Sequence, residues 1–224
     1  MKIALLTLRV DNNYGGNLQR YALSRFLAEM GHDVIVLYFR SEWNKDRFYI
    51  RVKNTIEYFI KTLFGDNPMP FPYWKHEDPN WEKKRINTFP FFQKYVKHSP
   101  LIWSFNALKK YIDKENFDAY IVGSDQVWRK CFTQRWGVER FFLDFVSEDK
   151  IKVFYAASFG IMDGDYSLED VALLTPLYKQ FDAVSVREDS ALLTLKKYGW
   201  TRPQANLVLD PTSLLSRKNG LKVL

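Results

Sequence analysis

The sequence predicts an α/β fold: a Rossmann-like open parallel sheet with helices on both faces. Short apolar runs are continuous rather than alternating, as expected of strands that are buried on both faces. Segments with a helical spacing of apolar residues separate most of these runs. Polar or glycine-bearing clusters follow them directly, as at the carboxyl ends of strands in open α/β sheets. The expected strands are 2–8, 32–39, 118–122, 150–157, 182–186 and 206–209.

The first strand leads into the segment DNNYGGN, residues 11–17. Gly15 and Gly16 would let the backbone turn there and approach a ligand closely. Asn17 is expected to cap a helix over 17–30, whose first N–H groups and dipole would face an anion. The segment lacks the third glycine of the dinucleotide fingerprint and the Gly-Lys-Ser/Thr of a Walker loop. A tight strand–helix turn without a ligand is the alternative.

Helical segments connect the later strands. The strand over 32–39 completes a βαβ unit, which is expected to be right-handed. Ser167 and Asp170 form a capping-box-like start of the next helix, which Pro176 is expected to kink or break. A further helix is predicted over 189–198.

Polar clusters recur where the later strands end. They are GSDQVW over 123–128, SFG over 158–160, VRE over 186–188 and DPT over 210–212. Because a doubly wound sheet gathers the carboxyl ends of its strands at one edge, the clusters together predict a binding site there. Trp128 is expected either to form the floor of a sugar pocket or to pack in the core. Cys131 has no histidine nearby in the sequence and is predicted to be inert.

The segment 40–114 interrupts the strand–helix alternation and is predicted to be a helical insert or lid. It holds 15 Lys and Arg against 8 Asp and Glu, which accounts for the whole net charge of +7. Helical spacing occurs over 48–64, 81–95 and 104–115, and a proline-rich loop is expected over 67–79. Basic residues among aromatics can bind nucleic acid, acidic sugars or a membrane surface. A cap whose aromatics fill its own core is favoured, and no nucleic-acid partner is expected.

The length and the composition of the chain fit one large domain. The chain has 224 residues, against about 150 for a typical domain, and 46% of them are hydrophobic. Its single cysteine excludes an internal disulfide and fits a reducing compartment. No apolar run approaches the roughly 20 residues of a membrane span. A cytoplasmic protein is expected, with peripheral contact at the inner face of a membrane through 40–114 as a further option.

Several segments, in this order, resemble the polysaccharide pyruvyl transferase family. The most specific of them is DAYIVGSDQVW, in which a strand runs into a polar loop. The resemblance depends on the combination of segments, and together these segments span nearly the whole chain apart from 40–114. The matching segments are NNYGGNLQRYAL (12–23), DAYIVGSDQVW (118–128), ASFG (157–160), SVREDSALLTLKKYG (185–199) and VLDPTSLL (208–215).

This resemblance implies a fold like that of the two-domain GT-B glycosyltransferases, with this chain as the N-terminal half and the C-terminal half absent. It implies transfer of a pyruvyl group from phosphoenolpyruvate, as donor substrate, to a saccharide acceptor that can be lipid-linked, forming a ketal in a cell-surface polysaccharide. No cofactor and no metal are expected. The residues expected to bind substrate are Asp11, Asn13, Tyr14, Gly15, Gly16, Asn17, Ser124, Asp125, Gln126, Ser158 and Arg187.

Arg187 matches the family's arginine after the strand over 182–186. Its guanidinium could donate two parallel hydrogen bonds to the donor's phosphate or carboxylate. An ion pair with Glu188 or Asp189 is the alternative. The family's acid–base histidine has no counterpart here, and His76 and His98 cannot be assigned to it. The chain alone is therefore expected to fold but to transfer little pyruvate. A sugar- or anion-binding module without catalysis, and a GT-B-like glycosyltransferase using a nucleotide sugar, are the alternative functions.

Overall fold

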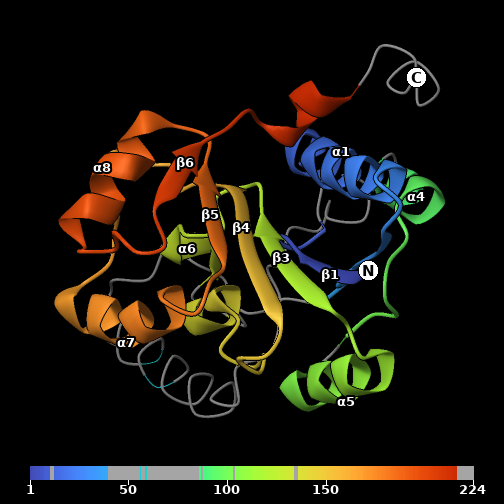
Figure 1. Cartoon of the computed structure of the whole chain (residues 1–224). Helices are drawn as coiled ribbons and strands as arrows, with labels where there is room; N and C mark the ends of the chain where they lie inside the picture. The colour runs from blue at the N-terminus through green and yellow to red at the C-terminus, as the bar shows by residue number, and fades with distance from the viewer. Residues whose placement is uncertain are drawn as a thin grey trace.

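The computed structural model describes residues 1–10, 13–39, 88–102, 104–133 and 136–215, together with residues 56, 59 and 86. The strands among them form one sheet in the order β2-β1-β3-β4-β5-β6, and every neighbouring pair is parallel (Figure 1). The predicted α/β fold is confirmed. The strands are β1 (Lys2–Leu6), β2 (Asp33–Val36), β3 (Ala119–Gly123), β4 (Ile151–Ala157), β5 (Ala183–Val186) and β6 (Ala205–Leu207).

Helices cover both faces of the sheet, which explains why the strands are continuous apolar runs. Ile3 and Leu5 of β1 pack in one hydrophobic cluster, whereas Ala4 and Leu6 pack in the other. The two clusters lie on opposite faces because successive side chains of a strand point in opposite directions. The helices are α1 (Tyr14–Glu29) and α4 (Thr88–Tyr95) on one face, and α5 (Phe105–Glu115), α7 (Leu168–Tyr178) and α8 (Asp189–Lys197) on the other.

Aromatic side chains fill the core beneath the end of β3. Trp128 is completely buried, and its ring centroid lies 4.8 Å from that of Phe154 and 5.0 Å from that of Phe159. Phe142, at the end of the short 3₁₀ helix η2 (Val138–Phe142), joins the same cluster. Of the two roles expected for Trp128, packing is therefore the correct one, because the buried ring offers no surface to a sugar.

Within the described residues, two prolines lie inside α-helices. α7 continues through Pro176 to Tyr178, so the helix does not break there, whereas the expected kink stays a prediction. Pro176 lies in the last turn, where its missing N–H removes a backbone hydrogen bond only near the helix end. Pro90 lies in the first turn of α4, where a proline is tolerated because the N–H groups of that turn have no partner within the helix.

The described part of 40–114 packs on the sheet. α4 lies against α1, with the rings of Tyr21 and Phe91 5.6 Å apart, whereas Leu108 of α5 is buried on the opposite face. The expected helix over 48–64, apart from residues 56 and 59, and the loop over 67–79 lie outside the described residues, so the lid stays a prediction.

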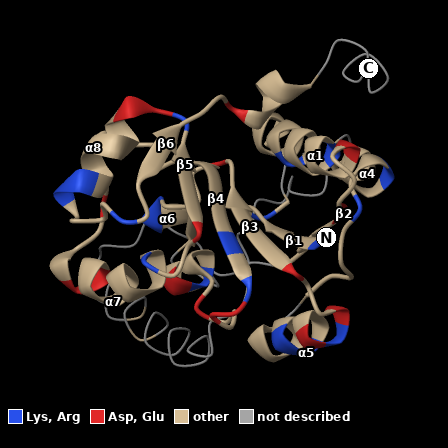
Figure 2. Ribbon diagram, viewed as in Figure 1, with Lys and Arg blue, Asp and Glu red and all other residues tan. Residues whose placement is uncertain are grey.

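Basic and acidic residues both occur along α5 and α8 (Figure 2). In the part of the chain that the structure covers, no helix is long and apolar enough to span a membrane.

Candidate functional site

Helix α1 begins earlier than the sequence predicts. Asn13 is its N-cap, and the side-chain oxygen of Asn13 accepts a hydrogen bond from the N–H of Gly16 at 3.2 Å. Gly15 and Gly16 therefore belong to the first turn of the helix, and their predicted role in a loop is wrong. A Cβ on Gly16 would lie 3.1 Å from Oδ2 of Asp125, so the missing side chain lets α1 approach the loop after β3.

Asn17 is a buried residue inside α1, and its predicted role as N-cap is wrong as well. Its side-chain oxygen accepts a hydrogen bond from Nη1 of Arg20, which is itself buried. Nε of Arg20 donates to Thr7, and Nη2 donates to the carbonyl of Leu8 at 2.7 Å. The pair joins the start of α1 to the end of β1. Sequence reasoning missed Arg20, although its spacing of three residues from Asn17 in a helix is a usable signal.

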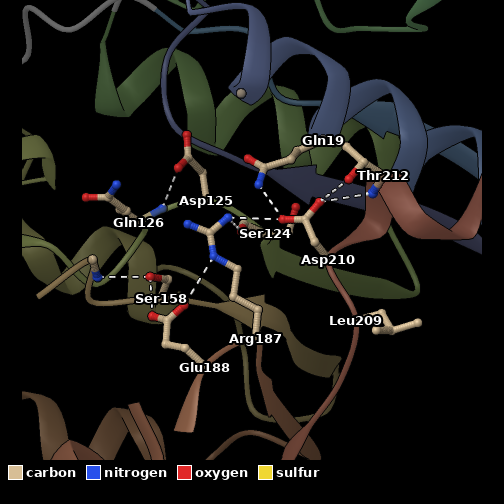
Figure 3. A network of polar contacts seen from close by, with 12 residues as sticks. Gln19, Ser124, Asp125, Gln126, Ser158, Arg187, Glu188, Leu209, Asp210 and Thr212 are labelled. Carbon is tan, nitrogen blue, oxygen red and sulfur yellow. Dashed lines mark hydrogen bonds and ion pairs between the residues drawn. The ribbon is translucent and has the colours of Figure 1, made fainter. Parts of the chain in front are cut away.

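Arg187, directly after β5, joins the ends of three strands (Figure 3). Its Nη1 donates to the carbonyl of Ser124 at 3.2 Å and to Oδ2 of Asp210 at 3.1 Å. Its Nε donates to Glu188 at 3.3 Å. The guanidinium is thus fixed from two sides, and the Nη2 amino group has no partner among the residues that the structure describes. The ion pair with Glu188, which the sequence analysis gave as the alternative role, exists, and Asp210 adds a second.

Ser158 and Glu188 form a second part of the same network. The hydroxyl of Ser158, which is fully buried, donates to Oε1 of Glu188 and accepts a hydrogen bond from the N–H of Gly160 at 2.9 Å. Since the other oxygen of Glu188 accepts from Arg187, this carboxylate connects the ends of β4 and β5. Neither Glu188 nor Asp210 was among the predicted site residues, although both stand in the polar clusters VRE and DPT.

Asp210, which follows β6, accepts hydrogen bonds at both oxygens. Gln19 of α1 donates to Oδ2 at 2.5 Å, and the backbone and hydroxyl of Thr212 donate to Oδ1 at 3.0 Å and 2.7 Å. Burial raises the pKa of this carboxyl, but the hydrogen bonds from Thr212, Gln19 and Arg187 outweigh burial and leave the pKa below its usual value. Asp210 therefore stays ionised and joins α1 to Arg187.

Replacing Asp210 with asparagine should reduce stability in a pH-dependent way. A carboxyl whose pKa is lowered by folding stabilises the protein above its unfolded pKa of about 3.9, and this contribution is lost as the pH falls through the folded pKa. We therefore expect Asp210→Asn to lower the free energy of unfolding by about 1–3 kcal/mol at pH 7 and by much less near pH 3. Urea unfolding at both pH values measures this, and an equal loss at both would contradict it.

The described residues form at least two cavities along this edge of the sheet. The first, of about 360 Å³, is lined by Asn13, Gly16, Asn17, Asp125 and Gln126 among the predicted residues. Its wall also includes Arg9, Arg20, the exposed Cys131 of the short helix α6 (Lys130–Thr133), and the aromatic residues Phe39, Phe132, Trp136 and Phe141.

The second cavity, of about 250 Å³, is lined by Ser158, Arg187 and Glu188 together with Gly160, Ile161, Met162 and Ser190. Seven of the predicted residues thus line one cavity or the other. Tyr14 is exposed at the start of α1, and Gly15 lines neither cavity. Ser124 is buried, with its hydroxyl unpaired among the described residues. Asp11 lies outside the described residues. Within the described residues, no group of three or more His, Cys, Asp or Glu could hold a metal ion.

Comparison with known proteins identifies the family. A search of curated proteins gives no match. Among solved structures, the chain is similar to an α-glucosyltransferase determined in complex with UDP-glucose and DNA containing an abasic site, at 11% identity and a TM-score of 0.40. The similarity covers 94% of this chain and 42% of that one, so the chain spans less than half the length of that enzyme. Residues 13–223 match the family model for polysaccharide pyruvyl transferase, and the chain therefore belongs to the polysaccharide pyruvyl transferase family.

Proposed function

We propose that this chain binds phosphoenolpyruvate at Arg187 and takes part in the transfer of its pyruvyl group to a saccharide of a cell-surface polysaccharide. The observation that carries the proposal is the guanidinium of Arg187, which is held by Ser124, Glu188 and Asp210 beside a cavity. Its Nη2 amino group is not engaged by any described residue and can donate to an anionic ligand. Family membership supports the same reaction.

Pyruvyl transfer has a demanding proton balance. Two hydroxyl oxygens of the saccharide form bonds to C2 of phosphoenolpyruvate, and the bond from C2 to the phosphate oxygen breaks. Each of the two hydroxyl groups loses one proton. C3 gains one proton as it becomes a methyl group, and the departing phosphate takes up the other. The reaction therefore needs a cation for phosphate and carboxylate, a proton donor for C3 and an acceptor for the hydroxyl protons.

The described residues beside Arg187 suit parts of this chemistry. In the proposal, Arg187 supplies the positive charge, and its fork matches the geometry of phosphate and carboxylate oxygens. Glu188 and Ser158 line the same cavity and share a hydrogen bond, so the proposal assigns the acid–base roles to them. The reaction as proposed needs neither a cofactor nor a metal.

The setting of the reaction is also part of the proposal. The chain would supply one Rossmann-like half of a GT-B-like cleft, with 40–114 as an insert that contacts the membrane surface near a lipid-linked acceptor. A cytoplasmic location agrees with the single cysteine. The mixture of basic and acidic residues on α5 and α8 argues against a nucleic-acid partner.

Isothermal titration calorimetry of the 224-residue chain tests the donor. We expect phosphoenolpyruvate to bind with a dissociation constant of about 1 mM or tighter, within the usual range for enzyme substrates. Pyruvate and inorganic phosphate, which each carry only part of the donor's charge, should bind more weakly. Binding of UDP-glucose without binding of phosphoenolpyruvate would overturn the proposal in favour of a nucleotide-sugar glycosyltransferase. Binding of a saccharide alone would favour a sugar-binding module.

A further inference from the structure

We infer that the larger cavity, beside α1, binds a saccharide through a pair of neighbouring hydroxyl groups, and that Gln126 separates this saccharide from the ligand of Arg187. That the saccharide is the acceptor rests on the proposed function. The binding of a saccharide does not, because it follows from the lining of the cavity. With about 360 Å³, the cavity has the size of a small-molecule site, for which roughly 300–1,000 Å³ is typical.

Asp125 and Gln126 offer this cavity a hydrogen-bond acceptor and a donor. Oδ1 of Asp125 accepts a hydrogen bond from the N–H of Gln126 at 2.8 Å, whereas Oδ2 has no partner among the described residues. Oε1 of Gln126 accepts from Arg129 at 2.9 Å, and its Nε2 amino group is likewise unengaged within the described chain. Because both residues line the cavity, this carboxylate oxygen and this amide N–H suit two hydroxyls of one ligand, one donating and one accepting.

The aromatic part of the wall fits a sugar, and the guanidinium of Arg20, which also lines the cavity, is already engaged by Thr7, Asn17 and the carbonyl of Leu8. Phe132 is half exposed and lines the cavity, together with the largely buried Trp136. Aromatic rings can contact the C–H faces of a sugar, while polar groups hold its hydroxyls. The carboxylate of Asp125 would repel the phosphate and carboxylate of phosphoenolpyruvate. In the second cavity, by contrast, Arg187 has an amino group available for an anion.

Gln126 lies between the two cavities. It lines the first, and its Oε1 is only 2.1 Å from the position that a Cβ of Gly160 would occupy. Gly160 lines the second cavity, and its φ of +66° is a conformation that glycine adopts without strain. The cavities are therefore separated by about the width of one side chain. A pair of hydroxyls held at Asp125 and Gln126 would lie next to a ligand held at Arg187, as formation of a ketal requires.

Saturation-transfer NMR with a panel of methyl hexopyranosides, in the absence of phosphoenolpyruvate, tests the saccharide site. We expect at least one glycoside to bind and Asp125→Asn to weaken its binding about tenfold or more, as for loss of a hydrogen bond to a charged group. The exposed Asp113 of α5 provides the matched control, and Asp113→Asn should bind as the wild type does.

Cys131 provides an independent measurement on the unaltered protein. It is the only cysteine in the chain, is exposed and lines the first cavity. A bound glycoside should therefore slow its alkylation by iodoacetamide severalfold, whereas phosphoenolpyruvate should not. Lack of glycoside binding, or glycoside binding that Asp125→Asn leaves unchanged, would overturn the inference. If glycosides bind as expected and phosphoenolpyruvate does not bind, the proposed function fails and the saccharide site stands.

Discussion

Replacing Arg187 with lysine is expected to weaken phosphoenolpyruvate binding by about 10- to 100-fold, as for the loss of charge-assisted hydrogen bonds worth about 1.5–3 kcal/mol. Lysine keeps the positive charge but not the planar fork. Its single ammonium group cannot donate to Ser124, Asp210 and Glu188 and also face a ligand, as the guanidinium does. Calorimetric titration with phosphoenolpyruvate measures the effect.

Arg25 gives the matched control for this substitution. It lies exposed on α1, where it pairs with Glu29, away from the residues of either cavity. Arg25→Lys should leave the affinity for phosphoenolpyruvate unchanged. If Arg187→Lys binds as tightly as the wild type while its circular dichroism is native, Arg187 only joins the strand ends, and the donor site must lie elsewhere.

Replacing Trp128 with alanine is expected to lower the free energy of unfolding by about 3–5 kcal/mol, as for other large buried aromatic residues. The ring is fully buried among Phe154, Phe159 and Phe142, and its removal would leave a cavity that rigid neighbours cannot fill. Urea unfolding followed by circular dichroism gives the value.

Trp128→Phe separates ring packing from hydrogen bonding. The indole N–H of Trp128 has no hydrogen-bond partner among the described residues, so phenylalanine should lose only part of the packing and less than half as much stability as alanine. Normal stability of Trp128→Ala, combined with loss of glycoside binding, would contradict the packing role and restore the sugar-pocket floor that the sequence also allowed.

The fold could be predicted because a strand that is buried on both faces of its sheet needs apolar residues at successive positions, and such runs can be recognised in the sequence. Runs such as IVLY within β2 and its continuation, or YIVG in β3, have no polar face, and only a sheet covered on both sides requires that. The position of Arg187 at the edge followed from the same logic. Asp210 was expected at the same edge, in the cluster DPT, but its contact with Arg187 was not predicted, because a contact between residues 23 positions apart depends on the way β5 and β6 pair.

The start of α1 shows why local rules failed at the site. Glycine is a poor helix former, so Gly15 and Gly16 indicated a loop and moved the expected cap to Asn17. In the structure, packing overrides this propensity: the absent side chain of Gly16 admits Asp125, while Asn13 caps the helix and Asn17 accepts from Arg20. Residues chosen for a tertiary contact look like turn residues when only their neighbours in sequence are considered.

The hydrogen bonds of Asp210 have a consequence for the way two ligands could influence each other. One carboxylate holds Gln19 of α1, a helix that borders the first cavity, and Arg187, which borders the second. A small displacement of α1 on occupation of one cavity would therefore be transmitted to the guanidinium at the other, without contact between the ligands. Such coupling is reciprocal, so each ligand would change the affinity for the other by the same factor.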